Sequence, residues 1–270
     1  MDSYPGPKEY WEKRLTENYS LDGTGFQTLG QQYNKWMYRI RKSIVKKYVK
    51  KTLSGLDCMN VFDVGSGTGF YVDMWLELGV RRVVGSDITD VAVKNLKRNY
   101  PHNEFYTLDI GEEELPDQLE TEKFEIISAF DVLFHIVDDA RYFTAIGNIN
   151  KLLAHGGFFF FSDNFLHRDA LRSHHQVSRS LASVERILQK TGFEILGRIP
   201  MFVIMNAPVD TRNRFLRVFW KLITSTAKKG EFASNVTGCV LYPIESFLTT
   251  IGTEGPSTEM MICKKIESNV

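Results

Sequence analysis

A glycine-rich loop between a predicted strand and a predicted helix constrains the fold of this chain more than any other feature. The loop reads Asp-Val-Gly-Ser-Gly-Thr-Gly over residues 63–69 and follows a short apolar run. Large apolar side chains at helical spacing follow it, from Tyr71 to Leu78. A strand, a glycine turn and a helix in this order present backbone N–H groups to a ligand in α/β proteins. We therefore predict an α/β domain that binds a ligand at this loop.

The spacing of the glycines distinguishes between two kinds of ligand. Dinucleotide-binding loops read Gly-x-Gly-x-x-Gly, but the third residue after Gly67 is Phe70. The pattern Asp-x-Gly-x-Gly-x-Gly instead resembles motif I of the class I S-adenosylmethionine (SAM) methyltransferases. This resemblance implies SAM as the cofactor, and an acidic residue beside the loop suits its ammonium group. The predicted cofactor-binding residues in this motif are Asp63, Gly65, Ser66, Gly67 and Gly69.

A second acidic residue stands at the end of the next predicted strand. Asp87 follows the glycine loop by about the length of one helix and one strand. A carboxylate at that position can accept hydrogen bonds from both ribose hydroxyls, as in dinucleotide-binding folds. Ile88 would then lie against the adenine. The alternative is that Asp87 caps the next helix, but Thr89 is better placed to do so.

The resemblance extends to the ends of two further predicted strands. It implies that Asp109 accepts a hydrogen bond from the adenine amino group and that Ile110 packs on the ring. Phe130 and Asp131 stand at the position of motif IV, where Asp131 would flank the methionine end of the cofactor. The continuation over residues 132–136, Val-Leu-Phe-His-Ile, is similar to one that is frequent in this family.

Alternating strand and helix patterns between residues 59 and 200 predict the fold class, an α/β doubly wound sheet. The resemblance implies a Rossmann-like sheet of seven strands, mostly parallel, with an antiparallel last strand for which residues 257–264 are the best candidate. We expect residues 1–58 to form an N-terminal helical cap and residues 59–270 to form the SAM-binding domain. Residues 201–256 are too long for a hairpin connection and would be a substrate-side insertion between the last two strands.

The N-terminal cap and the insertion carry most of the local positive charge. Residues 35–51 predict an amphipathic helix with a basic polar face, and residues 212–229 contain a second group of cations beside an apolar stripe. We interpret both as solvated helix faces; the alternative is a patch for an anionic acceptor or a membrane surface. Segments before motif I often close over the cofactor in the family, so Trp11, Tyr33 and Arg39 are candidates to line its site.

Three side chains that follow the fourth and fifth predicted strands are candidates for a catalytic base. An alcohol that accepts a methyl group must lose its proton, whereas an amine must only arrive unprotonated. His135 is the nearest by topology, although it could equally support the cofactor pocket, and Asp163 and His167 follow the next strand. Asp131, Asp163 and Asn164 offer oxygen ligands for a Mg²⁺ ion. Because Asp131 stands one place beyond the ligand position of the catechol-type enzymes, we predict no metal.

Charge and cysteine content limit the partners and the compartment. Lys+Arg and Asp+Glu both number 33, so the chain has no overall field that attracts nucleic acid, and we predict no nucleic-acid partner. The three cysteines are far apart and form no disulfide or metal spacing. Together with the lack of a visible signal peptide, they favour a cytoplasmic location.

These observations predict a SAM-dependent methyltransferase that O-methylates a small-molecule hydroxyl, on a sugar or a secondary metabolite. N-methylation and a protein or lipid-linked acceptor remain open as alternatives. A non-catalytic SAM- or nucleotide-binding module is a reading from a different class, which the polar side chains after the fourth and fifth strands argue against. A nicotinamide-dependent oxidoreductase is opposed by the glycine spacing.

Overall fold

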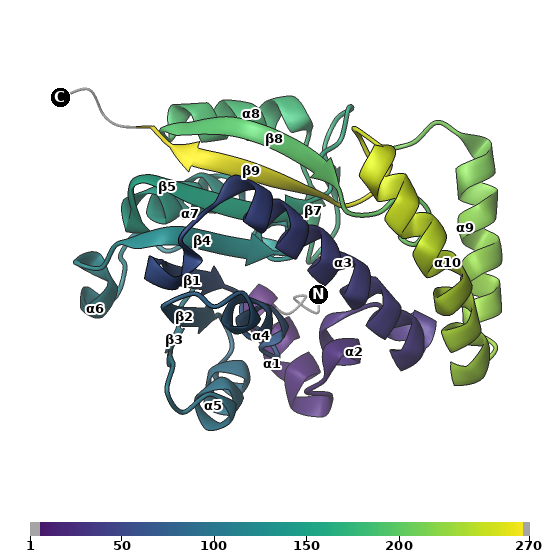
Figure 1. Cartoon of the computed structure of the whole chain (residues 1–270), viewed down its shortest axis with the longest axis horizontal. Coiled ribbons are helices and arrows are strands. Elements are labelled where there is room, and N and C mark those ends of the chain that lie inside the picture. The colour runs from purple at the N-terminus through teal and green to yellow at the C-terminus, as the bar shows by residue number, and fades with distance from the viewer. Residues whose placement is uncertain (1–5, 267–270) are drawn as a thin grey trace, which may run out of the picture.

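The computed structural model, which describes residues 6–266, contains a seven-stranded sheet with helices on both faces (Figure 1). The strand order is β3-β2-β1-β4-β5-β9-β8; β9 is antiparallel to both of its neighbours, and the other pairs are parallel. The predicted fold class is therefore confirmed. The strands of this sheet are β1 (Asn60–Val64), β2 (Arg82–Asp87), β3 (Glu104–Thr107), β4 (Phe124–Phe130), β5 (Leu153–Asp163), β8 (Phe193–Pro200) and β9 (Glu259–Lys265).

Helices cover the two faces of the sheet, and alternate residues of each strand contact one layer or the other. Phe160 of β5 belongs to the core on one face, and Phe159 and Phe161 belong to the core on the opposite face. The helices of the first face are α3 (Gly30–Thr52), α4 (Phe70–Glu77) and α5 (Asp90–Asn99), and those of the second are α7 (Asp139–Leu152) and α8 (Leu181–Lys190). The other elements are α1 (Pro7–Glu17), α2 (Leu21–Thr24), α6 (Asp117–Glu120), β6 (Leu171–Arg172) and β7 (Val177–Ser178).

The two ends of the chain meet through α3 and the helices of the long β8–β9 connection. This connection contains α9 (Arg214–Ala227) and α10 (Glu231–Ile251), and α10 lies between α3 and α9 at one end of the molecule (Figure 1). The carboxylate of Glu231 accepts hydrogen bonds from the backbone N–H groups of Gln31 and Gln32, and Ser234 Oγ accepts one from Tyr33. The first turn of α3 is therefore capped by side chains of α10.

No described helix is long and apolar enough to cross a bilayer.

Candidate functional site

A cavity of about 860 Å³ opens at the carboxyl ends of β1, β2 and β4. This is where open α/β sheets bind their ligands, and the volume lies in the range of small-molecule sites. Most of the predicted cofactor-binding residues line it, whereas Asp63 and Gly69 are not part of its wall. The predicted residues in the wall are Gly65, Ser66, Gly67, Asp87, Ile88, Asp109, Ile110, Phe130 and Asp131.

The three glycines of the loop all have positive φ angles, of 71°, 53° and 89° in chain order, but they are needed for different reasons. A Cβ on Gly65 would lie 2.3 Å from Val132 Cγ2, and one on Gly69 would lie 2.6 Å from the Tyr100 hydroxyl. A Cβ on Gly67 would meet nothing closer than Thr24 Cγ2 at 3.4 Å. Gly65 and Gly69 therefore allow the chain to pack on itself, while Gly67 leaves its space to the cavity.

Asp87 connects the glycine loop to the start of α5. Its Oδ2 accepts a hydrogen bond from Gly67 N at 2.9 Å, and its Oδ1 accepts from Thr89 N and Thr89 Oγ1 at 2.9 and 2.7 Å. Burial raises the pKa of this carboxyl, and the hydrogen bonds partly oppose that rise. Thr89 caps α5 by accepting from Ala92 N, as the sequence indicated. Asp87 is thus held at the cavity wall, where a carboxylate oxygen retains capacity to accept further bonds.

Asp63 is buried directly behind the loop. Its Oδ1 accepts a hydrogen bond from Ser128 Oγ at 2.6 Å, and Trp75 Nε1 donates to the same hydroxyl. Its Oδ2 has no partner among the described residues, and burial raises its pKa to about 7. A buried, unpaired carboxylate oxygen beside a glycine loop fits a cofactor with an ammonium group, because a buried acceptor without a partner is costly. The residues present therefore fit SAM.

Asp131 is the one described residue other than glycine with a positive φ, 59°. Its backbone N–H donates to Ser162 Oγ, which donates in turn to Asp131 Oδ1. Its Oδ2 lies 2.9 Å from Nε of Arg41, a residue of α3 that is only 7% exposed. Arg41 belongs to the basic run of residues 35–51 that was interpreted as a solvated face, and for this residue that interpretation is wrong. A buried cation instead fixes the acid at the motif IV position.

His135 is the only one of the three candidate bases that lines the cavity. Its Nδ1 lies 2.8 Å from the carbonyl oxygen of His175, which can only accept, so Nδ1 carries the proton and Nε2 is free of one. Burial is the main cause that lowers its pKa to about 4, so the ring is neutral near pH 7. The Trp11 ring packs edge-on at 4.9 Å from it. The expectation that Trp11 lines the site agrees with its place in the cavity wall.

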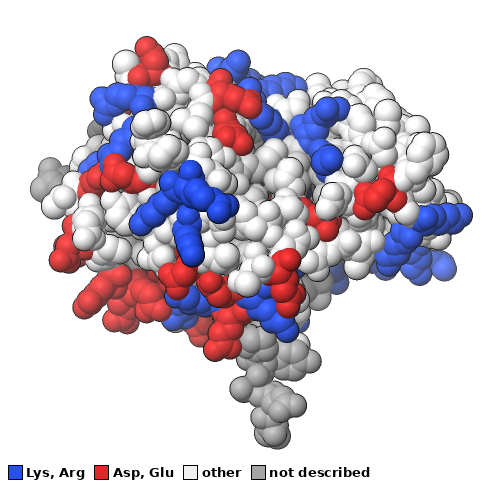
Figure 2. All heavy atoms as spheres, turned by 90° about the horizontal axis from the view of Figure 1, so that it is seen from below, with Lys and Arg blue, Asp and Glu red and all other residues white. Residues whose placement is uncertain are grey.

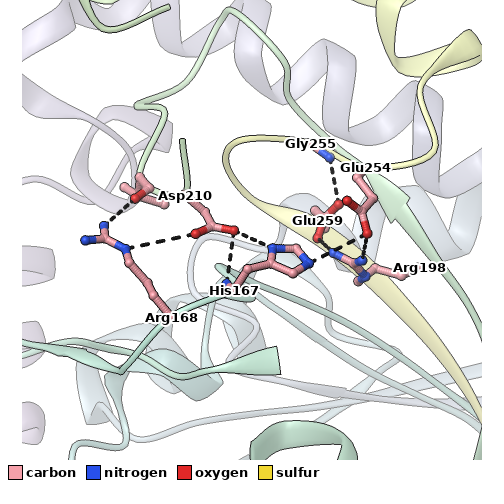
Figure 3. Close-up of polar contacts among 8 residues, drawn as sticks. His167, Arg168, Arg198, Asp210, Glu254, Gly255 and Glu259 are labelled. Atoms are coloured by element: carbon pink, nitrogen blue, oxygen red, sulfur yellow. Dashed lines mark hydrogen bonds and ion pairs between the residues drawn. The ribbon is translucent and has the colours of Figure 1, made fainter. Parts of the chain in front are cut away.

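Asp163 and His167 lie outside this cavity, contrary to their assignment as candidate bases. Asp163 is completely buried and accepts a hydrogen bond from Asn164 N. His167 is bound between two acids, with Nδ1 at 2.6 Å from Asp210 Oδ2 and Nε2 at 3.7 Å from Glu254 (Figure 3). We therefore do not propose either residue as a base.

Two residues of the cap also lie elsewhere than expected. The hydroxyl of Tyr33 donates to the carbonyl of Met205 in the core, and the Arg39 guanidinium stacks at 4.5 Å over Trp36. Neither is in the cavity wall. The cations of the α3 face are also partly paired, since Lys42 and Lys46 both bridge to Glu77. No described residue of the insertion 201–256 reaches the cavity, so its predicted position on the substrate side is not observed.

Comparisons with known proteins agree with this geometry. Residues 62–161 match a family model described as a methyltransferase domain. The ribosomal protein L11 methyltransferase of Staphylococcus aureus (strain MRSA252) is 30% identical over 142 residues, which are 51% of this chain and 38% of that protein. The chain thus spans less than half the length of the curated relatives that it matches.

Two solved structures share the fold over nearly the whole chain. The N-methyltransferase NodS from Bradyrhizobium japonicum WM9, in complex with S-adenosyl-L-homocysteine, has a TM-score of 0.57 and 13% identity and covers 97% of this chain and 100% of its own. The magnesium protoporphyrin IX methyltransferase ChlM from Synechocystis PCC 6803, with bound SAM, has a TM-score of 0.56 and 14% identity and covers 98% and 100%. At these identities the likeness establishes the fold.

Proposed function

Because residues 62–161 of this chain form a class I SAM-dependent methyltransferase domain, we propose that the protein is an enzyme that methylates a small-molecule hydroxyl. SAM is the cofactor of this family. When bound, it supplies a methyl group made electrophilic by the sulfonium. The observation that supports the proposal most is that one cavity joins the glycine loop to an unprotonated imidazole nitrogen, that of His135. A site of this kind can hold a cofactor and also receive a proton.

The residues of the site divide into those for the cofactor and those for the acceptor. The glycine loop, with Asp63 buried behind it, would hold the methionine end. In the cavity wall, Asp87 would accept from the ribose hydroxyls and Asp109 from the adenine amino group. Asp109 is positioned for this by Arg141, whose guanidinium lies 2.7 Å from Asp109 Oδ2. His135 Nε2 would take the proton of the acceptor hydroxyl as oxygen attacks the methyl carbon in line.

N-methylation of a small amine is the second candidate, because acidic side chains outnumber basic ones in the cavity wall. Lys8 and Arg141 are the basic residues of the wall. Such a wall would attract the protonated form of an amine, which must lose its proton before it can attack the methyl carbon. An anionic acceptor, which the sequence left open, would be repelled. The acidic residues are Glu9, Glu12, Asp87, Asp90, Asp109, Asp131 and Asp138.

Labelled SAM tests the proposed activity and identifies the acceptor. The protein is incubated with methyl-labelled SAM and fractions of cell extract, and the labelled product is isolated. A small-molecule methyl ether supports the proposal, and a methylated amine supports the second candidate. If the label enters protein or lipid-linked material, both are wrong.

We expect Asp87→Ala to weaken SAM binding by roughly ten- to hundredfold. Charge-assisted hydrogen bonds contribute about 1.5–3 kcal/mol each, water replaces part of that, and about 1.4 kcal/mol is a factor of ten. Titration calorimetry measures the effect. Thr89→Ala is the control, because it removes one donor to the Asp87 carboxylate, the Thr89 hydroxyl, and keeps the carboxylate and its two backbone donors. An equal loss in both variants would place the effect in the local fold rather than in a ribose contact.

We expect chelation with EDTA to leave turnover unchanged. Among the described residues, no three His, Cys, Asp or Glu side chains form a group that could hold a metal ion. Asp163, one of the considered oxygen ligands, is buried outside the cavity. Initial rates of methyl transfer with and without EDTA measure this. Loss of activity that Mg²⁺ restores would contradict it.

A further inference from the structure

Helices α9 and α10 expose apolar faces at one end of the molecule. On α9, Phe215, Val218 and Leu222 are 85%, 55% and 60% exposed. On α10, Phe232, Val240 and Phe247 are 84%, 60% and 62% exposed. Such residues recur at three, four or seven to eight positions, so each set forms a stripe along its helix. We call these two stripes together the α9/α10 surface.

The fold does not need this surface for its own core. The opposite side of α10 packs on α3, with Leu241 buried and Trp36 Nε1 donating to Asn235 Oδ1. The inner side of α9 is buried at Ile223 and Ala227. Contiguous exposed apolar side chains of this extent mark an interaction site on a soluble surface.

The charges around the α9/α10 surface are mostly positive. Residues 211–251, all of which the structure describes, contain six cations, and all six are exposed. The same segment contains two acids, exposed Glu231 and buried Glu245, and both accept hydrogen bonds from backbone N–H groups. Glu231 binds the N-terminus of α3, and buried Glu245 accepts from the backbone N–H groups of Val203, Ile204 and Met205. The exposed cations are Arg212, Arg214, Arg217, Lys221, Lys228 and Lys229.

Helix α9 by itself has the composition of a helix that lies at a membrane interface. Its 14 residues would extend about 21 Å, with phenylalanine and aliphatic residues on one face and arginine and lysine beside them. Helices of this composition lie in the plane of a bilayer, with the apolar face among the acyl chains and the cations at the headgroups. In Figure 2 the right-hand end of the molecule, where α9 and α10 lie, is mostly white, with blue side chains at its edge and red ones beside them.

We propose that the α9/α10 surface docks the protein on an anionic lipid bilayer. A second copy of the chain would cover the apolar stripes equally well, but it would bring six further cations against the first six. Anionic headgroups instead attract juxtaposed lysine and arginine side chains within a Debye length of the surface. The docking does not depend on the methyl acceptor, since no described residue of α9 or α10 lines the cavity.

Vesicle sedimentation tests the docking with the full chain. Wild-type protein is expected to sediment with vesicles of phosphatidylcholine and phosphatidylserine, and to stay in solution with phosphatidylcholine alone. Phe215→Ser combined with Phe232→Ser should lower the partition coefficient by roughly a hundredfold, about tenfold for each ring withdrawn from lipid. Because both rings are more than four-fifths exposed, this variant should keep the circular dichroism and the SAM affinity of the wild type.

A charge variant and its matched control separate docking from general electrostatics. Replacing Arg214, Arg217 and Lys221 with Gln should reduce sedimentation with anionic vesicles by about fivefold for each cation. Replacing Lys94, Lys97 and Arg98, which are exposed on α5, with Gln removes the same charge and should have little effect on sedimentation. The proposal would be overturned if the wild-type protein does not sediment with anionic vesicles, or if the two charge variants lose sedimentation equally. Light scattering that shows a dimer, which the phenylalanine variant converts to monomer without any vesicle binding, would also overturn it.

Discussion

Gly67→Val is expected to abolish SAM binding while the fold remains intact. The substituted Cβ would have its nearest protein contact at 3.4 Å, so the chain itself has room for it. The Cβ would enter the cavity at the turn of the loop, where the backbone of the loop must approach the cofactor closely. We expect the affinity measured by calorimetry to fall by at least roughly a hundredfold, which corresponds to about 2.8 kcal/mol.

Gly55→Val is the matched control for this experiment. Gly55 has a φ of 70°, close to the 53° of Gly67, and a Cβ there would meet nothing within 4 Å. Both variants therefore carry the same kind of backbone penalty, about 1–2 kcal/mol for a left-handed residue with a side chain. The difference between them isolates the steric conflict with the cofactor. An equal loss of binding in both, or tight binding of NADH in place of SAM by the wild type, would contradict the assignment of the loop.

The sequence predicted the succession of strands and helices along the chain well because the signals are local. Glycine loops, strand-end acids and helical apolar spacing are readable within ten residues. The start of β5 was not readable in this way. A His-Gly-Gly run after an apolar helical pattern is typical of a helix end, yet β5 begins at Leu153 and contains His155, Gly156 and Gly157. Gly156, with a φ of 69°, lies where the pairing register with β4 shifts, so these glycines mark an irregularity inside a strand.

The burial of Arg41 was missed although the sequence contained a signal for it. Arg41 stands four residues after Met37 and four before Val45, both of which are completely buried. Helical periodicity therefore places it on the inner face of α3. A run of neighbouring lysines and arginines obscured this, because a charge run is usually a solvated face. The partner at motif IV lies 90 residues away, and no local pattern indicates such a contact.

Asp163 was assigned to the site because it ends a strand, but the alternation of side chains decides its direction. It has the same parity in β5 as Phe159 and Phe161, whose rings belong to the core on the α7 side. Its carboxyl therefore faces Tyr142 and Arg179, and burial there raises its pKa to about 7. Strand-end position alone predicts the edge of the sheet, and parity is needed to predict the face.

His135→Asn is expected to lower kcat by about a hundredfold and to leave the SAM affinity unchanged. The amide of asparagine can still donate a hydrogen bond to the His175 carbonyl, but it cannot take a proton. General bases contribute roughly 10²–10⁴ to the rate, and we expect the lower end because an imidazole with a pKa of about 4 is a weak base. The exposed His155, replaced in the same way, is the control and should not alter kcat.

The lowered pKa of His135 also predicts how kcat and the stability of the protein depend on pH. The ring stays neutral down to about pH 4, so kcat should show no rise near pH 6.5 from this group. Between pH 4 and 6.5 this histidine is protonated in the unfolded chain but neutral in the folded chain. Its contribution to the free energy of unfolding is therefore fully present above pH 6.5 and is lost as the pH is lowered. His135→Asn should reduce that loss, measured as the change in Tm between pH 7 and 5. A kcat that increases through pH 6.5 in the wild type and not in His135→Asn would show that the ring titrates normally and that burial does not hold it neutral. A kcat unchanged by the substitution would show that His135 is not a general base, as expected for an amine acceptor that arrives unprotonated.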